Sequence, residues 1–235
     1  MSTFVLVHGA WHGSWCWKRV RSALQQLGHE VFTPTLTGVG ERSHLLAPHI
    51  NMDTHIDDVA NLIRWEELSD IVLCGHSYGG TVVSGVAERL ADRIRALVYL
   101  EAFVLQDGQS LFDTLPAPMR EMQIEGARLH GDGWKVPHIP AGVFNVNAKD
   151  REWVNRQCTK QPMATFEQPM RLKGKADAIR NITYILATDF EETPFPQFYE
   201  RAKARNWKTL TVACGHDVML DLPAELTQIL LRAAQ

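Results

Sequence analysis

A serine at the centre of the run GHSYG, residues 75–79, is the residue best placed to do covalent chemistry. A serine hydroxyl is a weak nucleophile until a neighbouring base removes its proton. The run follows a short apolar segment, Ile71–Cys74, and opens a segment with helical periodicity, Gly79–Ala91. A sharp turn between a buried strand and a helix exposes such a serine and requires small residues two places before and after it. We therefore predict that Ser77 is a catalytic nucleophile.

The base that Ser77 requires is best supplied by His216, one of ten histidines in the chain. His216 follows an apolar segment, Thr209–Ala213, and precedes the last segment with helical periodicity, Pro223–Ala233. Because the carboxyl ends of parallel strands meet at one edge of a sheet, we expect this loop and the serine turn to lie together. Catalytic serine–histidine pairs occur with the serine first in the chain and the histidine last, which is the order of Ser77 and His216.

The histidine in turn needs a carboxylate that holds its tautomer and stabilises its charged form. Glu101 directly follows the apolar segment Ile94–Leu100, where a buried carboxylate without a partner would be costly. Asp189 and Glu191 follow the next apolar segment, Ile182–Leu186, and belong to the same edge. We expect Glu101 to be this acid, and Asp189 and Glu191 remain as alternatives.

Attack of a serine on a carbonyl carbon leaves a negative oxygen, which two N–H groups must bind. We assign one to the backbone of Tyr78, the residue after the nucleophile, and the other to Ala10. Ala10 belongs to the run HGAWHG, residues 8–13, whose glycines let the backbone approach a ligand closely. We interpret His8 and His12 as hydrogen-bonding groups within this loop, because metal ligands at this spacing usually lie on a helix.

Short apolar segments alternate with longer amphipathic ones along the chain. Such short apolar segments are typical of strands buried on both faces, and hence of a parallel sheet. The alternation predicts an α/β fold with a doubly wound, mostly parallel sheet of about six strands. The predicted strands are Phe4–Val7, Glu30–Pro34, Ile71–Cys74, Ile94–Leu100, Ile182–Leu186 and Thr209–Ala213. The predicted helices are Trp15–Leu27, Asp53–Glu67, Gly79–Ala91, Gln197–Arg205 and Pro223–Ala233, with Asp53 as the N-cap of the second.

Residues 103–177 break this alternation, because they hold no clear strand and five prolines precede Pro169. A structureless loop of this length is improbable in a compact domain. We expect a helical cap inserted here over one end of the sheet, and a core built from residues 1–102 and 178–235. The cap supplies apolar side chains that would set the substrate: Phe103, Leu105, Phe112, Met119, Met122, Trp134, Phe144, Trp153 and Met163.

The composition excludes several other classes of protein. The 235 residues carry a formal charge of −3, with 45% hydrophobic and 22% charged residues, which is ordinary for a globular domain. Such a charge gives no footprint for nucleic acid or an anionic membrane, and no apolar stretch is long enough to span a bilayer. We expect a cytoplasmic enzyme with reduced cysteines and a small-molecule substrate. We expect no metal or organic cofactor, and the sequence leaves a homodimer open.

Three runs together resemble the α/β-hydrolase superfamily: VHGAWHGSWCW at 7–17, GHSYGG at 75–80 and GHD at 215–217. The resemblance covers the whole chain. Within the superfamily the chain is similar to the small cofactor-free branch that contains plant methyl-ester esterases and hydroxynitrile lyases, and to bacterial pyrethroid-hydrolase-like esterases. This resemblance implies Ser77 as nucleophile, His216 as base, and the backbone of Ala10 and Tyr78 as oxyanion donors.

The chain departs from this branch at several positions. The plant members place the acid after the penultimate strand, where this chain has Asp189 and Glu191. Some haloalkane dehalogenases instead carry a Glu in a Tyr-x-Glu-Ala context, which Glu101 resembles. Hydroxynitrile lyases typically carry Thr at the position of Gly9, and Lys where this chain has Asp217.

These departures favour an ester hydrolase that acts through an acyl-enzyme on small to medium hydrophobic esters, aromatic ones included. A hydroxynitrile-lyase-like or other serine- and histidine-dependent lyase on the same scaffold is the alternative. A non-catalytic ligand receptor is the less favoured alternative.

Overall fold

The computed structural model describes residues 1–190 and 193–235. Within these residues, one sheet has six strands in the order β2-β1-β3-β4-β7-β8, and all of its pairings are parallel. The strands are β1 (Thr3–Val7), β2 (Glu30–Phe32), β3 (Ile71–His76), β4 (Ile94–Leu100), β7 (Asn181–Ala187) and β8 (Lys208–Val212). The predicted fold class is confirmed, and every predicted strand is present, with its ends within two residues of the prediction.

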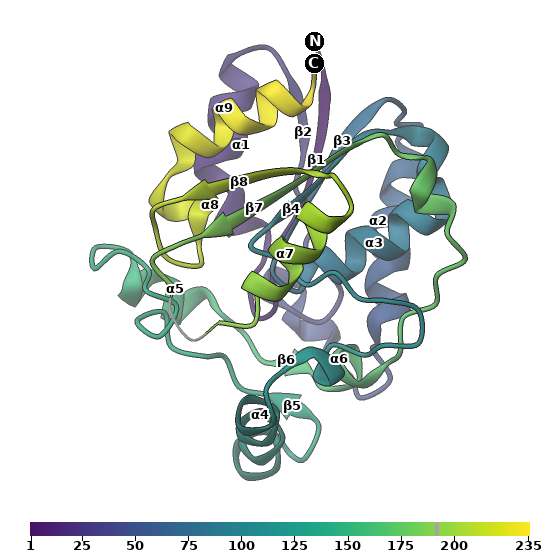
Figure 1. Cartoon of the computed structure of the whole chain (residues 1–235). Coiled ribbons are helices and arrows are strands. Elements are labelled where there is room, and N and C mark those ends of the chain that lie inside the picture. The colour runs from purple at the N-terminus through teal and green to yellow at the C-terminus, as the bar shows by residue number, and fades with distance from the viewer. Residues whose placement is uncertain (191–192) are drawn as a thin grey trace.

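Helices cover both faces of this sheet (Figure 1). On one face α1 (Lys18–Gln26) packs against α9 (Pro223–Ala233). The other face carries α2 (Met52–Trp65), α3 (Gly79–Leu90) and α7 (Pro196–Ala204). All six residues of β3 are buried, as expected for a central parallel strand covered on both sides. The turn that follows β3 therefore starts from a strand that is buried along its whole length.

The N-terminus of α2 differs from the prediction that Asp53 caps it. The N-cap is Asn51, whose side-chain oxygen accepts a hydrogen bond from the Thr54 backbone N–H at 3.1 Å. The Thr54 hydroxyl in turn lies 3.4 Å from the Asn51 backbone nitrogen, which completes a capping box. Asp53 lies in the first turn instead, where its negative charge interacts favourably with the positive end of the helix dipole.

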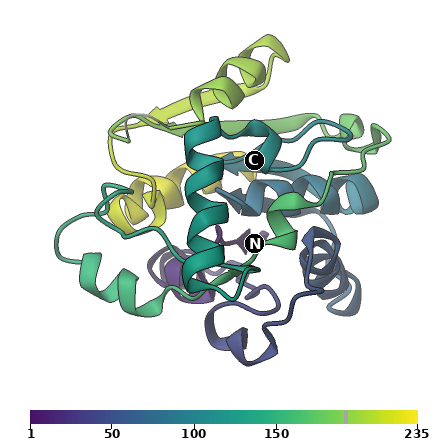
Figure 2. The ribbon, with the colours of Figure 1, turned by 90° about the horizontal axis from the view of Figure 1, so that it is seen from below.

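Between β4 and β7 the chain leaves the sheet and covers its carboxyl edge. The segment holds the helices α4 (Ala117–His130), α5 (Arg151–Gln157) and α6 (Ala164–Glu167). It also holds an antiparallel pair, β5 (Lys135–Val136) with β6 (Gln161–Pro162), which was not predicted because two-residue strands leave no periodic pattern. Figure 2 shows α4 crossing over the strand ends. A short helix, α8 (Val218–Asp221), follows β8 in the chain. In the described residues we find no helix with the length and hydropathy that a membrane crossing requires.

The capping box makes a stability prediction. Replacing Asn51 by Ala removes the acceptor for the Thr54 N–H, so unfolding should become easier by about 1 kcal/mol. For a chain of this size the midpoint of thermal unfolding should fall by roughly 2–4 °C. Asn61→Ala, on the exposed face of the same helix, is the control and should shift the midpoint far less. An equal effect of both variants would contradict the assignment of the cap.

Candidate active site

Ser77 lies on a strained turn directly after β3. Its backbone φ is 53°, in the left-handed region that non-glycine residues rarely adopt. Hydrogen bonds on both sides hold this conformation: the Ser77 N–H donates to the Leu100 carbonyl at 3.2 Å, and the Ser77 carbonyl accepts from Gly80 and Phe103 at 2.9 and 3.1 Å. A strained residue that is fixed in this way commonly marks a functional position.

The glycines around Ser77 are required because the backbones approach too closely for a side chain. A Cβ atom at Gly75 would lie 2.5 Å from the carbonyl oxygen of Gly79, and one at Gly79 would lie 2.6 Å from that of His8. The spacing of the run thus follows from packing between β3, the start of α3 and the loop after β1. The turn matches the strand–turn–helix context that the sequence predicted.

One cavity of about 620 Å³ brings four of the predicted site residues together: Ser77, His216, Ala10 and Tyr78. They reach it from the turn after β3, the loop after β8 and the loop after β1. The rest of the wall is mainly apolar and comes largely from the cap. It includes Trp11, Phe103, Leu111, Leu115, Met119, Met122, Phe144, Phe166, Phe190 and Phe195. Glu101 and Asp189 do not line this cavity.

The ring of His216 is enclosed by aromatic side chains. It stacks on Phe195 with ring centroids 5.0 Å apart, and the rings of Phe144 and Phe190 lie at 4.9 and 5.3 Å. Burial lowers the pKa of His216 to about 3, and the charge of nearby His12 acts in the same direction. The imidazole is therefore neutral at physiological pH, which is the form that accepts a proton.

Glu101 is buried at the carboxyl end of β4, with a left-handed φ of 43°. Its Oε2 accepts a hydrogen bond from the Ala187 N–H at 2.6 Å, while Oε1 has no partner among the described residues. Burial raises the pKa of Glu101 to about 8 despite that hydrogen bond. Nδ1 of His216 is likewise buried and without a partner in the described part of the chain.

The two alternative acids have different surroundings. Asp189 is exposed, and its carboxylate accepts a hydrogen bond from the neighbouring Thr188 hydroxyl at 3.2 Å. The Asp189 backbone, not its carboxylate, contacts the loop after β8 that carries His216. The Asp189 N–H donates a hydrogen bond to the Cys214 carbonyl at 3.1 Å. Glu191 lies outside the described residues. The choice of the acid therefore remains a prediction.

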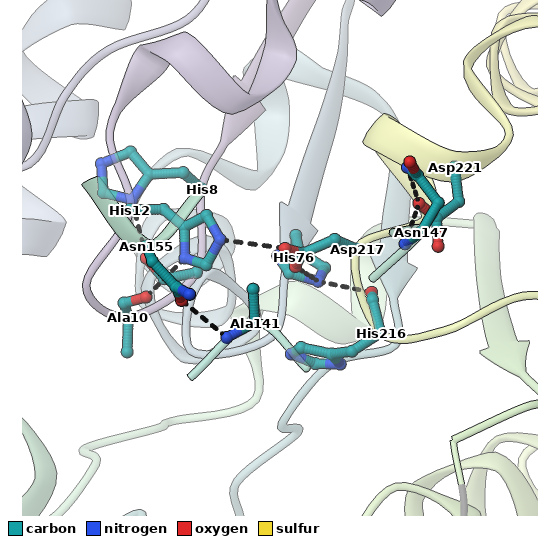
Figure 3. A network of polar contacts seen from close by, with 11 residues as sticks. His8, Ala10, His12, His76, Ala141, Asn147, Asn155, His216, Asp217 and Asp221 are labelled. Atoms are coloured by element: carbon teal, nitrogen blue, oxygen red, sulfur yellow. Dashed lines mark hydrogen bonds and ion pairs between the residues drawn. The ribbon is translucent and has the colours of Figure 1, made fainter. Parts of the chain in front are cut away.

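A buried pair that the sequence analysis missed joins the loop after β1 to the loop after β8 (Figure 3). Nε2 of His12 lies 3.2 Å from Oδ2 of Asp217, and both side chains are buried. Burial opposes the charge on His12, but the Asp217 carboxylate outweighs it and raises the His12 pKa. Burial would likewise raise the pKa of Asp217, but His12 overrides it and lowers that pKa. The two residues form an ion pair, and only their distance in space, not their spacing in sequence, reveals it.

The histidines of the first loop fix the peptide groups next to the serine. Nε2 of His8 accepts from the Leu36 N–H at 3.1 Å, so Nδ1 carries the proton and donates to the Gly9 carbonyl at 2.8 Å. The N–H of a trans peptide points away from its carbonyl, so this bond orients the Ala10 N–H. His12 holds the next peptide, because its Nδ1 donates to the Ala10 carbonyl at 2.7 Å.

His76 holds the loop after β8 in place, because its Nε2 donates a hydrogen bond to the His216 carbonyl at 3.0 Å. Burial lowers the pKa of His76 well below its ordinary value, so this ring is neutral. His76, His216 and Asp217 also have potential metal-ligating atoms within 4.8 Å of one another. Nε2 of His76 and Oδ2 of Asp217 are engaged within the protein, whereas Nδ1 of His76, Nδ1 of His216 and Oδ1 of Asp217 have no hydrogen-bond partner among the described residues.

Comparisons with known proteins bear on the family and the fold of the chain. Residues 4–229 match the family described as "Alpha/beta hydrolase family". The chain is 46% identical over 236 residues to the carbendazim hydrolyzing esterase of Nocardioides sp. (strain SG-4G), which covers 97% of this chain and 98% of that protein. It is 34% identical to the pFDCC methylesterase MES16 of Arabidopsis thaliana, over 98% of this chain and 93% of that protein.

Among solved structures, an extracellular alpha/beta-hydrolase from a Paenibacillus species superposes with a TM-score of 0.86, over 99% of both chains. Its sequence identity to this chain is 24%, so this likeness concerns the fold alone.

The ion pair predicts a pH-dependent cost for Asp217→Asn. The pKa of His12 is raised above its ordinary value of 6.5. Its contribution to stability is therefore complete below pH 6.5 and is lost as the pH rises through the raised pKa of the folded protein. The pKa of Asp217 is lowered below its ordinary value of 3.8. Its contribution to stability is therefore present above pH 3.8 and is lost as the pH falls through the lowered pKa of the folded protein. Between these limits the variant should be less stable than wild type by about 3 kcal/mol, and the gap should narrow toward alkaline pH.

Urea unfolding of both proteins at acidic, neutral and alkaline pH measures this gap. Asp189→Asn removes an exposed carboxylate from the same edge and should change stability by less than about 0.5 kcal/mol at each pH. A gap for Asp217→Asn that does not vary with pH would contradict the ion pair.

Proposed function

Because the chain belongs to the alpha/beta hydrolase family and is a carboxylic ester hydrolase, we propose that it cleaves small to medium hydrophobic esters through an acyl-enzyme on Ser77. The observation that carries this proposal is that one apolar cavity holds a serine on a strained turn, a neutral buried histidine and two backbone segments assigned as oxyanion donors. These are the parts that acyl transfer requires.

In the proposed reaction, Ser77 attacks the ester carbonyl while His216 takes its proton. The N–H groups of Ala10 and Tyr78 bind the negative oxygen of the tetrahedral intermediate. His216 then returns the proton to the leaving alcohol, which departs and leaves the acyl group on Ser77. His216 next removes a proton from water while the water oxygen attacks the acyl carbon. The bond between the acyl carbon and Oγ of Ser77 then breaks, the acid leaves, and His216 returns its proton to Oγ.

The wall of the cavity supports aromatic esters as the substrate class. Its volume of about 620 Å³ lies in the usual range for small-molecule sites, and five phenylalanine rings contribute to its surface. Aromatic rings pack favourably on one another in edge-to-face and offset arrangements. The 46% identical relative is likewise named an esterase. We propose aromatic esters of small to medium size as the substrates of this chain.

We propose Glu101 as the acid that serves His216. The support is that Oε1 of Glu101 and Nδ1 of His216 are both buried at the carboxyl edge of the sheet and both lack a partner among the described residues. Burial shifts their pKa values in opposite directions, each toward its neutral form. Pairing the two would stabilise both charged forms, as the developing imidazolium of the reaction requires.

The position of Gly9 supports an esterase over a hydroxynitrile lyase. A Cβ atom at Gly9 would lie 2.9 Å from both Nδ1 of His76 and Cβ of Ser77, so a threonine does not fit there without a shift. The second lyase feature is a lysine after the histidine. At that position this chain has Asp217, which is engaged with His12.

The first test of the proposal is Ser77→Ala. Loss of the nucleophile should lower kcat for p-nitrophenyl acetate by about 10⁴- to 10⁶-fold, while the protein stays folded. Wild-type protein should also react with a fluorophosphonate probe, and the variant should not. Retention of more than about a hundredth of the wild-type kcat would exclude Ser77 as the nucleophile. Far-ultraviolet circular dichroism confirms folding of the variant.

The second test concerns the acid. Glu101→Gln should lower kcat by about 10⁴-fold with little change in KM, because the histidine loses its orienting partner. The lowered pKa that burial imposes on His216 should then be unopposed, so the acid limb of kcat/KM should move to lower pH. Asp189→Asn and Glu191→Gln are the matched variants and should cost less than about tenfold. A collapse of either one, with Glu101→Gln near wild type, would place the acid after β7.

A further inference from the structure

A histidine interrupts the otherwise apolar buried face of α2. The buried residues of this helix are Met52, His55, Ile56, Val59, Ala60 and Ile63. His55 is fully buried and takes no part in the proposed proton transfers. A polar ring in such a place is costly unless its nitrogens find partners, so the contacts of His55 show what the residue holds.

Both ring nitrogens of His55 have a partner. Nε2 lies 2.8 Å from the Thr37 carbonyl oxygen, which only accepts, so Nε2 carries the proton and donates. Burial lowers the pKa of His55 to about 4, so the ring is neutral at physiological pH and Nδ1 is an acceptor. The Tyr78 hydroxyl lies 2.9 Å from Nδ1 and donates to it. The first of these bonds therefore fixes the tautomer that the second one requires.

The Thr37 carbonyl is in turn held by α2. The N–H and the hydroxyl of Thr37 donate to the two carboxylate oxygens of Asp58 at 2.6 and 2.7 Å. Asp58 lies one turn after His55 on the same helix. The acceptor that the Tyr78 hydroxyl meets is thus fixed by α2 and by the loop after β2.

Tyr78 is the residue whose backbone N–H is assigned to the oxyanion. Its side chain is buried and reaches from the start of α3 to α2, where its ring meets the His55 ring edge-on with centroids 5.6 Å apart. The Tyr78 carbonyl accepts from the Thr81 N–H at 2.9 Å and from the Thr81 hydroxyl at 2.8 Å. The Thr81 bonds belong to α3 itself, whereas the His55 bond ties Tyr78 to a second helix.

The His55 bond acts on the Tyr78 N–H through the planar peptide that joins Ser77 to Tyr78. The carbonyl of this peptide is held by the N–H groups of Gly80 and Phe103. The other end of the peptide is the Tyr78 Cα atom, from which the anchored side chain extends. With both ends held, the left-handed strain at Ser77 cannot be relieved by turning the Tyr78 N–H away from the cavity.

We propose that His55 is a positioning residue, which holds the Tyr78 side chain so that the Tyr78 N–H points at the carbonyl oxygen of the ester. The proposal rests on the esterase function proposed above, with Tyr78 as an oxyanion donor. It adds α2, which packs beside α3 on one face of the sheet, to the elements that shape the site (Figure 1). His55 does not line the cavity, so it acts on the substrate only through Tyr78.

Two substitutions separate the two bonds of His55. Asparagine places its amide oxygen near the position of Nδ1, where it accepts from the Tyr78 hydroxyl, and glutamine places its amide nitrogen near the position of Nε2, where it donates to Thr37. His55→Gln should lower kcat for p-nitrophenyl acetate by about 10- to 100-fold with little change in KM, because an oxyanion donor is misplaced. His55→Asn should stay within about threefold of the wild-type kcat.

Tyr78→Phe removes the same hydrogen bond from the other side and keeps the ring. Its kcat should match that of His55→Gln, and the double variant should lose no more than either single variant, because all three lack one shared bond.

The thionoester of the same substrate, with sulfur in place of the carbonyl oxygen, separates positioning from a loss of folded protein. Sulfur is a weak hydrogen-bond acceptor, so the thionoester gains little from the oxyanion donors. The ratio of kcat/KM for the oxygen ester to that for the thionoester should therefore fall by about tenfold in His55→Gln and in Tyr78→Phe. It should keep its wild-type value in His55→Asn. Partial unfolding would lower both rates equally and leave the ratio unchanged.

An unchanged ratio in His55→Gln overturns the proposal even where kcat falls, because the histidine then supports the fold alone. Equal damage in His55→Asn and His55→Gln overturns it as well. If His55→Gln does not fold, Tyr78→Phe carries the test, and an unchanged ratio in that variant has the same meaning. Absence of Ser77-dependent hydrolysis of p-nitrophenyl acetate refutes the proposed esterase function itself. Ser77-dependent hydrolysis with unchanged ratios refutes the positioning role alone.

Discussion

The ion pair between His12 and Asp217 is the interaction on which the active-site edge depends. β1 and β8 are separated by three strands in the sheet, yet the loops that follow them meet at this pair. Desolvating two charges costs several kcal/mol per ion, and the attraction between the two charges offsets this cost. His12 also donates a hydrogen bond to the Ala10 carbonyl, whereas Oδ1 of Asp217 has no hydrogen-bond partner among the described residues. The pair thereby fixes the loop after β1 and the loop after β8 relative to each other.

The strained turn at Ser77 is held by hydrogen bonds and by close packing of the backbone around it. Its carbonyl is held by the start of α3 and by the first residues of the cap, so the serine cannot relax without disturbing both. The glycines that flank it bring β3 and the first loop into backbone contact. A fully buried central strand, a closely packed turn and a buried ion pair together position Ser77, the loop after β1 and the loop after β8.

Patterns local in sequence predicted most of the fold, because buried parallel strands are continuous apolar runs and the GHSYG run demands its own context. The predictions that failed or were missing concern contacts between distant segments. Asn51 rather than Asp53 caps α2, and both are good caps, so composition did not separate them. The role of Asp217 was hidden because His12 is 205 positions away in the chain.

The charges at this edge also set the protonation state of His216, the proposed base. Burial is the main reason that the His216 pKa is low, and the positive charge of His12 adds to it. His12 keeps that charge only because Asp217 neutralises it, so the pair leaves the resting histidine uncharged without adding net charge to the site. A base held so far toward its neutral form accepts a proton in the transition state only if a carboxylate compensates it at that moment. This argument supports the proposal that a second buried acid serves His216. Glu101 is the residue proposed for that role, because its Oε1 is buried at the same edge and has no partner among the described residues.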